Sequence, residues 1–129
     1  MTKTKTKKEA PMAKRRKLKN KIGYCPNKYL GINKKGGHYV FIRNIHKNGT
    51  CDVNVITSLE DKNKKFSNKK LRQVRKGNTY AIPFYDSNFT RWSGINKKPI
   101  QNVKASNIED VGKKKIKRRH FFFINKFMK

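Results

Sequence analysis

Acidic residues are the scarcest charged residues in this sequence. The 129-residue chain has 7 Asp and Glu against 35 Lys and Arg, which gives a formal net charge of +28. A two-metal nuclease needs several carboxylates that converge on its ions, so this composition argues against that class of enzyme. The two adjacent acidic pairs, Glu60-Asp61 and Glu109-Asp110, fit surface or capping roles, because neighbouring side chains on a chain usually point apart.

Cysteine is rarer still, with two residues. Cys25 and Cys51 do not form a CxxC pair, and their spacing with His38 and His46 matches none of the usual zinc patterns. We therefore expect no metal and no other cofactor. No apolar run near the N-terminus resembles a secretory signal, so we expect a cytoplasmic location in which both thiols stay reduced.

Several longer signals are also absent. No segment is long and apolar enough to predict a membrane span, and no long amphipathic segment predicts binding to a membrane surface. The sequence has no Gly-rich phosphate loop and no GxSxG elbow, so it does not support nucleotide hydrolysis. It has no helix-turn-helix or zinc-finger pattern that would favour DNA. A chain with such an excess of positive charge is expected to bind a polyanion, and nucleic acid is the expected partner.

What the sequence does contain is a clear β-hairpin. Two β-branched, apolar runs, His38–Ile45 and Thr50–Thr57, flank Asn48-Gly49, and Asn-Gly is the strongest short hairpin signal. The first run is apolar over four consecutive residues, which is typical of a strand buried on both faces. In the second run apolar residues alternate with Asp52 and Asn54, which predicts a half-buried strand.

The rest of the chain predicts a small, mainly β fold. Residues 1–22 are expected to form a basic arm that is disordered when free, and residues 23–129 a single domain that begins with a loop over 23–37. We expect a helix over 68–76 capped by Ser67, for which a twisted edge strand is the alternative, and then a strand over 79–83 and an irregular aromatic loop over 84–98. A strand over 100–103, a helical turn over 106–111 and a closing strand over 121–127 follow, and a helix is the alternative for the last of these. This order suggests an SH3-like or OB-like antiparallel barrel with one or two short helices and basic flexible ends.

Two kinds of side chain are candidates for binding nucleic acid. Basic segments would hold phosphates, and aromatic residues of the loop, Phe89 among them, would stack on bases; a solubilising arm and core packing are the respective alternatives. The barrel and the aromatic loop favour RNA over DNA. The residues expected to contact nucleic acid are Lys14, Arg15, Arg16, Lys17, Arg43, Ser58, Tyr85, Arg91, Trp92, Lys113, Lys114, Lys115, Arg118 and Arg119.

Two stretches resemble the PemK/MazF toxin family. The run GHYVFI at 37–42 followed by VNVITS at 53–58 is similar to the family's Gly-Arg-Pro-x-Leu-Val strand and its strand ending in Pro-hydrophobic-Thr-Ser, and VKASNIEDV at 103–111 is similar to a later family segment. The resemblance covers roughly residues 36–60 and 99–113. It implies an SH3-like barrel and an RNA endonuclease, in which Thr57 matches the active-site threonine and His38 stands where the catalytic arginine usually stands.

Three functions therefore stay open. The first is a binding module for RNA. The second is a metal-independent endoribonuclease with His38 and Thr57 as catalytic residues, joined by Arg43 or Arg91 at the phosphate. The third is a structural component of a nucleoprotein assembly. An acidic, antitoxin-like protein partner and a homodimer are further partners that the sequence leaves open, and no membrane partner is expected.

Overall fold

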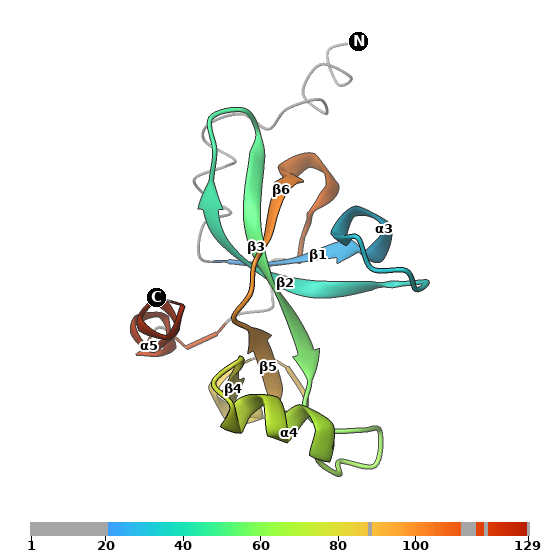
Figure 1. Cartoon of the computed structure of the whole chain (residues 1–129), viewed down its shortest axis with the longest axis vertical. Coiled ribbons are helices and arrows are strands. Elements are labelled where there is room, and N and C mark those ends of the chain that lie inside the picture. The colour runs from blue at the N-terminus through green and yellow to red at the C-terminus, as the bar shows by residue number, and fades with distance from the viewer. Residues whose placement is uncertain (1–20, 88, 112–115, 118, 129) are drawn as a thin grey trace.

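One antiparallel sheet dominates the structure. The computed structural model describes residues 21–87, 89–111, 116–117 and 119–128, and within them seven strands and three short helices (Figure 1). The mainly β, antiparallel prediction is confirmed, and the sheet is bent but not closed into a barrel. None of the helices in this part of the chain has the length and apolar character needed to cross a membrane.

The strands are joined in the order β4-β5-β3-β2-β1-β7, with β6 paired to β3. In chain order the elements are β1 (Ile22–Pro26), α3 (Asn27–Leu30), β2 (Gly37–Ile45), β3 (Thr50–Ser58), α4 (Asn68–Arg75), β4 (Thr79–Ile82), the 3-10 turn η1 (Phe84–Asp86), β5 (Ser93–Asn96), β6 (Ile100–Lys104), the 3-10 turn η2 (Ala105–Asn107), β7 (Glu109–Asp110) and α5 (Arg119–Phe127).

The predicted hairpin is the centre of this sheet. Strands β2 and β3 pair from Tyr39–Ile56 to Ile45–Cys51, and Gly49 supplies the left-handed conformation that the turn needs, with a φ of 86°. The second strand differs from the prediction, because Asp52 and Asn54 are both buried rather than exposed. β3 is covered on both faces, and it pairs with β2 along one edge and with β5 and β6 along the other.

The side chain of Asn54 supplies hydrogen bonds where the strand pairing along one edge of β3 is interrupted. β5 and β6 follow one another along the same edge of β3, and the chain leaves that edge at residues 97–99. Asn54 Nδ2 donates hydrogen bonds to the carbonyl oxygens of Asn96 and Lys97 at 2.8 and 3.1 Å. The amide nitrogen thus replaces the backbone donors that a continuous ladder would supply, whereas the buried Oδ1 of Asn54 has no hydrogen-bond partner among the described residues.

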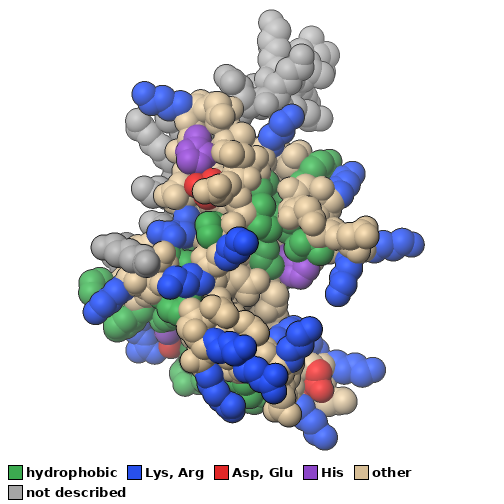
Figure 2. Space-filling view, in the orientation of Figure 1, with side chains coloured by type: hydrophobic (Ala, Val, Ile, Leu, Met, Phe, Trp, Pro, Cys, Tyr) green, Lys and Arg blue, Asp and Glu red, His purple; other side chains and the backbone are tan. Residues whose placement is uncertain are grey.

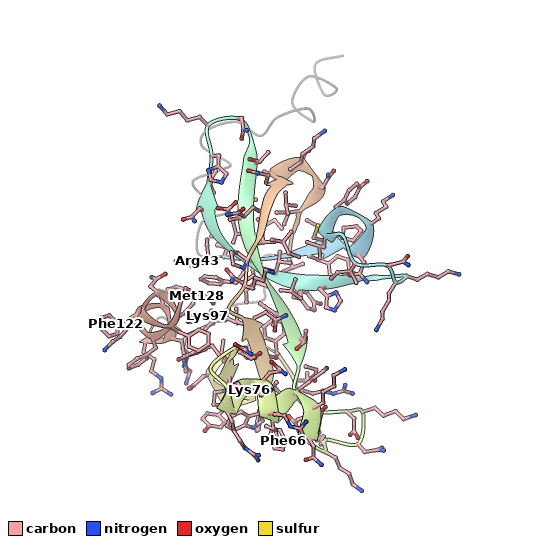
Figure 3. All side chains as sticks on the ribbon, in the orientation of Figure 1. Arg43, Phe66, Lys76, Lys97, Phe122 and Met128 are labelled. Atoms are coloured by element: carbon pink, nitrogen blue, oxygen red, sulfur yellow. The ribbon has the colours of Figure 1, made fainter. Side chains whose placement is uncertain are left out.

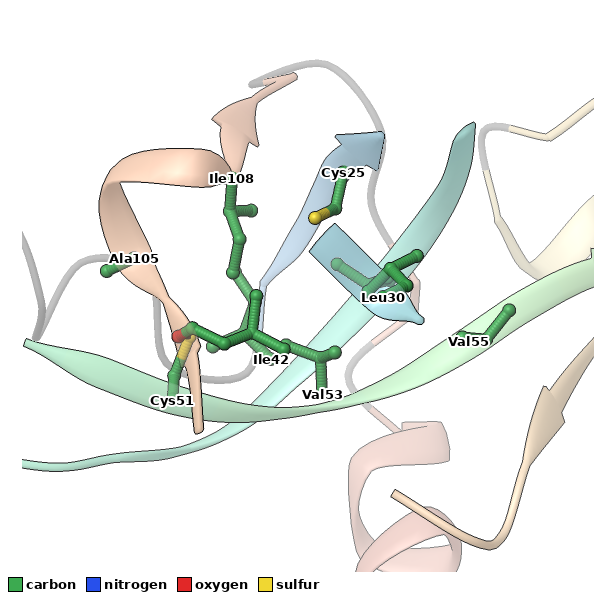
Figure 4. Close-up of a cluster of buried hydrophobic side chains, with 10 residues drawn as sticks. Cys25, Leu30, Ile42, Cys51, Val53, Val55, Ala105 and Ile108 are labelled. Atoms are coloured by element: carbon green, nitrogen blue, oxygen red, sulfur yellow. Dashed lines mark hydrogen bonds between the residues drawn. The ribbon is translucent and has the colours of Figure 1, made fainter. Parts of the chain in front are cut away.

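Two apolar clusters lie on opposite faces of the hairpin. The first includes Ile42, Val53 and both cysteines, and it is covered by α3 and η2 (Figure 4). The second includes Phe41 and Ile56 and is covered by α5, which contributes Ile124. Because the sheet carries a core on each side, its central strands β2 and β3 are buried on both faces over their middle residues.

Three elements differ from the sequence-based expectation. Residues 23–37 are not a continuous loop, since they contain most of β1 and all of α3, and Gly23 and Pro26 hide the strand pattern. β1 also begins at Ile22, inside the segment assigned to the basic arm. β5 lies within the predicted aromatic loop. Residues 121–127 form helix α5 rather than a strand.

Other elements are confirmed by the structure. Helix α4 begins after Ser67, whose Oγ accepts a hydrogen bond from the backbone N–H of Lys70 at 3.4 Å. Strands β4 and β6 occupy the predicted positions. The helical turn expected over 106–111 is present only in part, because η2 covers Ala105–Asn107 and Glu109–Asp110 form the short β7.

The two thiols are expected to be unreactive while the protein is folded. Cys25 and Cys51 are fully buried, and burial raises the pKa of Cys25 to about 11 and that of Cys51 to about 12. The thiolate is the reactive form, so an aromatic disulfide reagent should detect neither thiol in native buffer and both in denaturant. Fast reaction of either thiol in native buffer would contradict this burial.

Candidate nucleic-acid interface

His38 and Thr57 line one open cleft. The β2–β3 ladder ends at the pair Tyr39–Ile56, and His38 and Thr57 are the next residues on their strands, where the two strands separate (Figure 1). Residues of α4, β4, β5 and the loop that follows α3 contribute to the walls around a volume of about 1050 Å³. The structure therefore brings the two predicted catalytic residues to the same cleft.

The cleft is positively charged. Lys34, Lys97 and Lys98 line it, and no Asp or Glu occurs among its described lining residues. Lys97 and Lys98 are there because the chain leaves the edge of β3 at residues 97–99. Three ammonium groups around a cleft whose described lining has no carboxylate to offset their charge favour a phosphate-bearing ligand.

Asn27 fixes the proton position on His38. The Nδ2 of Asn27 donates to the carbonyl oxygens of Lys34 and Lys35 at 3.3 and 3.2 Å, so its Oδ1 is the atom that meets His38 Nδ1 at 2.6 Å. Because Oδ1 only accepts, Nδ1 carries the proton and Nε2 of the neutral ring is left as an acceptor.

The charge state of His38 agrees with that geometry. Burial lowers the pKa of His38 below its usual 6.5, and the positive charges of Lys70 and Lys34 lower it further. The ring is therefore neutral at pH 7. A neutral histidine with a fixed tautomer, oriented by a third group, is the arrangement that general bases use.

A smaller cavity lies beside the cleft. Thr57, Ser58 and Arg91 line it, around a volume of about 270 Å³. The hydroxyl of Ser58 donates to the carbonyl oxygen of Glu60 at 2.6 Å, so it is used to turn the chain at the end of β3. Thr57 and Arg91 are thus the predicted side chains best placed to meet a ligand here.

Four aromatic rings form a continuous row, in which three rings are exposed and Trp92 is half-buried. Phe84 contacts Tyr85, Tyr85 contacts Trp92, and Trp92 contacts Phe66, all edge-to-face, with ring centroids 5.4, 6.2 and 5.7 Å apart. Phe84, Tyr85 and Phe66 are 49, 58 and 42% exposed. We call these four residues the aromatic row.

The aromatic row differs from the predicted stacking set. Tyr85 and Trp92 belong to it, whereas Phe89 packs against Tyr39, with centroids 5.3 Å apart, beside the second core cluster. Phe84 and Phe66 were missing from the predicted contacts. The sequence signal for Phe66 is that it is the single aromatic residue of the lysine-rich loop over 60–67.

Asp86 ties the C-terminal elements to the sheet. Its carboxylate, which is almost fully buried, accepts hydrogen bonds from Arg119 at 2.6 Å and from His120 Nε2 at 2.7 Å, and it lies 3.4 Å from Lys117 Nζ. His120 Nδ1 also contacts the hydroxyl of Tyr80 at 2.7 Å. The Arg119 guanidinium, with His120, holds the pKa of Asp86 well below its usual range. Arg119, a predicted nucleic-acid contact, thus has a structural partner.

The remaining predicted contacts lie elsewhere. Arg43 occupies the irregularity in β2 between Ile42 and Asn44, lines neither cavity and lies on the α5 side of the molecule (Figure 3). Eight predicted contacts lie outside the described residues: Lys14, Arg15, Arg16, Lys17, Lys113, Lys114, Lys115 and Arg118.

Comparisons with known proteins add no relatives. No family model, no curated protein and no solved structure matches the chain. The described residues contain no group of three or more His, Cys, Asp or Glu placed to hold a metal ion. Any functional assignment therefore depends on the residues themselves.

Proposed function

We propose that the protein binds nucleic acid, with a preference for RNA. The observation that supports this is the way the fold uses its few acids. Asp86 is buried and paired with Arg119, Lys117 and His120, and Asp52 is buried and paired with His46. These two carboxylates are thereby withdrawn from the surface on which the basic side chains lie.

Two further acids are engaged by the backbone. Glu60 accepts the N–H of Trp92 at 2.6 Å, and Asp61 accepts the N–H groups of Asn63 and Lys65 at 2.8 and 3.0 Å. Figure 2 shows the result on one face, where Lys and Arg side chains are spread widely, most densely around α4, and acidic ones are few. Such a surface gains affinity for a polyphosphate by releasing its counterions.

Binding is expected to fall steeply with salt. If six or more phosphates are neutralised, raising NaCl from about 50 to about 200 mM should weaken RNA binding by roughly 10³-fold. Fluorescence anisotropy of a labelled RNA strand measures this, with a DNA strand of the same sequence as the comparison. An affinity that changes less than about tenfold over this range, or is too weak to measure at low salt, would contradict the proposal.

A metal-independent endoribonuclease is the second candidate. The observation that favours it is the shared cleft of His38 and Thr57, and the resemblance to the PemK/MazF family supports the same activity. In this reaction the RNA 2′-oxygen bonds to phosphorus and its proton passes to His38 Nε2. The bond from phosphorus to the 5′-oxygen breaks, and the leaving oxygen takes a proton from water, while Lys97 and Lys98 offset the phosphate charge.

A further inference from the structure

We propose that the aromatic row is a track for unpaired, single-stranded nucleic acid. This inference rests on the proposed binding function and specifies the form of nucleic acid bound. The row joins three stretches that are distant in sequence: Phe66 precedes α4, Phe84 and Tyr85 form η1, and Trp92 precedes β5. Phe66, Phe84 and Tyr85 are 42, 49 and 58% exposed, and bases stack on exposed aromatic rings.

One end of the row lies beside a basic loop. Phe66 forms an isolated β-bridge with Glu60, which closes the loop 61–65. Asp61 shapes this loop by accepting two backbone N–H groups. The loop contributes Lys62, Lys64 and Lys65, all three exposed. Phosphates that flank a base stacked on Phe66 therefore meet positive charge.

The other end of the row lies beside Lys117, which precedes α5. Ile116 forms a β-bridge with Ser87, and the backbone N–H of Lys117 donates to the carbonyl oxygen of Asp86 at 2.9 Å. These contacts hold Lys117 next to η1, which carries Phe84 and Tyr85. The row thus runs from the lysines of the 61–65 loop to Lys117, whose ammonium group also lies 3.4 Å from Asp86. A strand with its bases on the rings and its phosphates on the lysines fits this arrangement.

This arrangement selects for unpaired bases. A duplex keeps its base faces stacked on one another, so it can use the lysines but not the rings. A polyanion without bases can likewise use only the lysines. The aromatic row therefore predicts a preference for single strands that charge alone cannot produce.

The single tryptophan of the chain makes this measurable. Trp92 is in the middle of the row, so its fluorescence reports directly on stacking. An unstructured oligouridylate of about 12 nucleotides should quench the emission, whereas a duplex of that length and inorganic polyphosphate should not. This arm of the experiment uses the unaltered protein and does not depend on the folding of any variant.

Substitutions provide the second arm. Tyr85→Ala and Phe66→Ala should each weaken binding of the oligouridylate by about tenfold and leave polyphosphate binding unchanged. Phe122→Ala is the matched control, because Phe122 is 68% exposed, lies on α5 and is distant from Phe66 in Figure 3. Its oligouridylate affinity should stay within about twofold of that of the parent.

The nucleic-acid-binding function and the role of the aromatic row can be refuted by different results. Salt-sensitive RNA binding with no quenching, or with equal losses in Tyr85→Ala and Phe122→Ala, would overturn the aromatic row as the binding track and leave the binding function intact. Quenching by the duplex as strong as by the single strand would also overturn it. Failure of every RNA to bind would overturn both.

Discussion

Replacing Asp86 with alanine is expected to detach α5 from the sheet and to lower the melting temperature by on the order of 10 °C. The substitution removes the acceptor of Arg119 and His120 and leaves both donors without their partner. It also frees the helix whose Ile124 completes the second core cluster. Thermal unfolding followed by circular dichroism measures the loss, and amide hydrogen exchange should locate it in α5.

The pH dependence of this effect has a definite sign. Because the pKa of Asp86 is depressed in the folded state, its contribution is fully present above the unfolded value of about 3.9 and is lost as the pH falls through the folded value. The stability gap between the parent and Asp86→Asn should therefore be constant from pH 7 to about pH 5 and shrink only in stronger acid. If the stability gap narrowed between pH 7 and pH 5, a titrating group other than Asp86 would have to account for it.

Replacing His38 with alanine is expected to lower RNA cleavage by about 10²–10⁴-fold if the cleft is catalytic, since this is the usual contribution of a general base. The assay is incubation of a labelled mixed-sequence RNA in EDTA, and Thr57→Ala should also lower the rate. His46→Ala is the matched control: His46 is bound to Asp52 and does not line the cleft. Equal rates for the parent and His38→Ala would remove the nuclease candidate.

The role of Asn27 can be separated from simple loss of structure. Asn27→Asp keeps an acceptor for His38 Nδ1 but adds a negative charge, which favours the protonated ring and raises its pKa. The pH at which cleavage reaches half its maximum should rise accordingly, because more of the base is protonated at neutral pH. An unchanged pH profile together with a lower rate would mean that Asn27 acts only on the fold.

The hairpin and helix α4 could be predicted because their signals are local. Asn48-Gly49 sets the turn, and Ser67 caps the helix. The helical nature of α5 could not be fixed in the same way, since a short run of phenylalanines suits a buried strand as well as a helix. Its helical period became visible only through burial, with His120 and Ile124 inward and Phe122 outward.

The candidate site was only partly predictable for a similar reason. His38 and Thr57 lie on paired strands, so the hairpin register alone brings them together. The cations around them come from segments distant in sequence, Lys34 after α3 and Lys97 between β5 and β6. The burial of Asn54 was not predictable, because alternation indicates which side of a strand a residue faces but not whether a second layer covers that side.

The position of β3 among its partners determines the order in which this protein can fold. β3 can pair with β2 as a local hairpin within microseconds. Its other edge can pair only after β5 and β6 have reached it. These strands are distant in sequence, since the contact of Cys51 with Val103 spans 52 positions of the chain. Until those strands and α5 arrive, Phe41, Ile56 and Ile82 are exposed to water beside an unpaired strand edge. The half-folded chain is thus the form most prone to self-association, and a bound polyanion would counter it by engaging the basic surface while the sheet is completed.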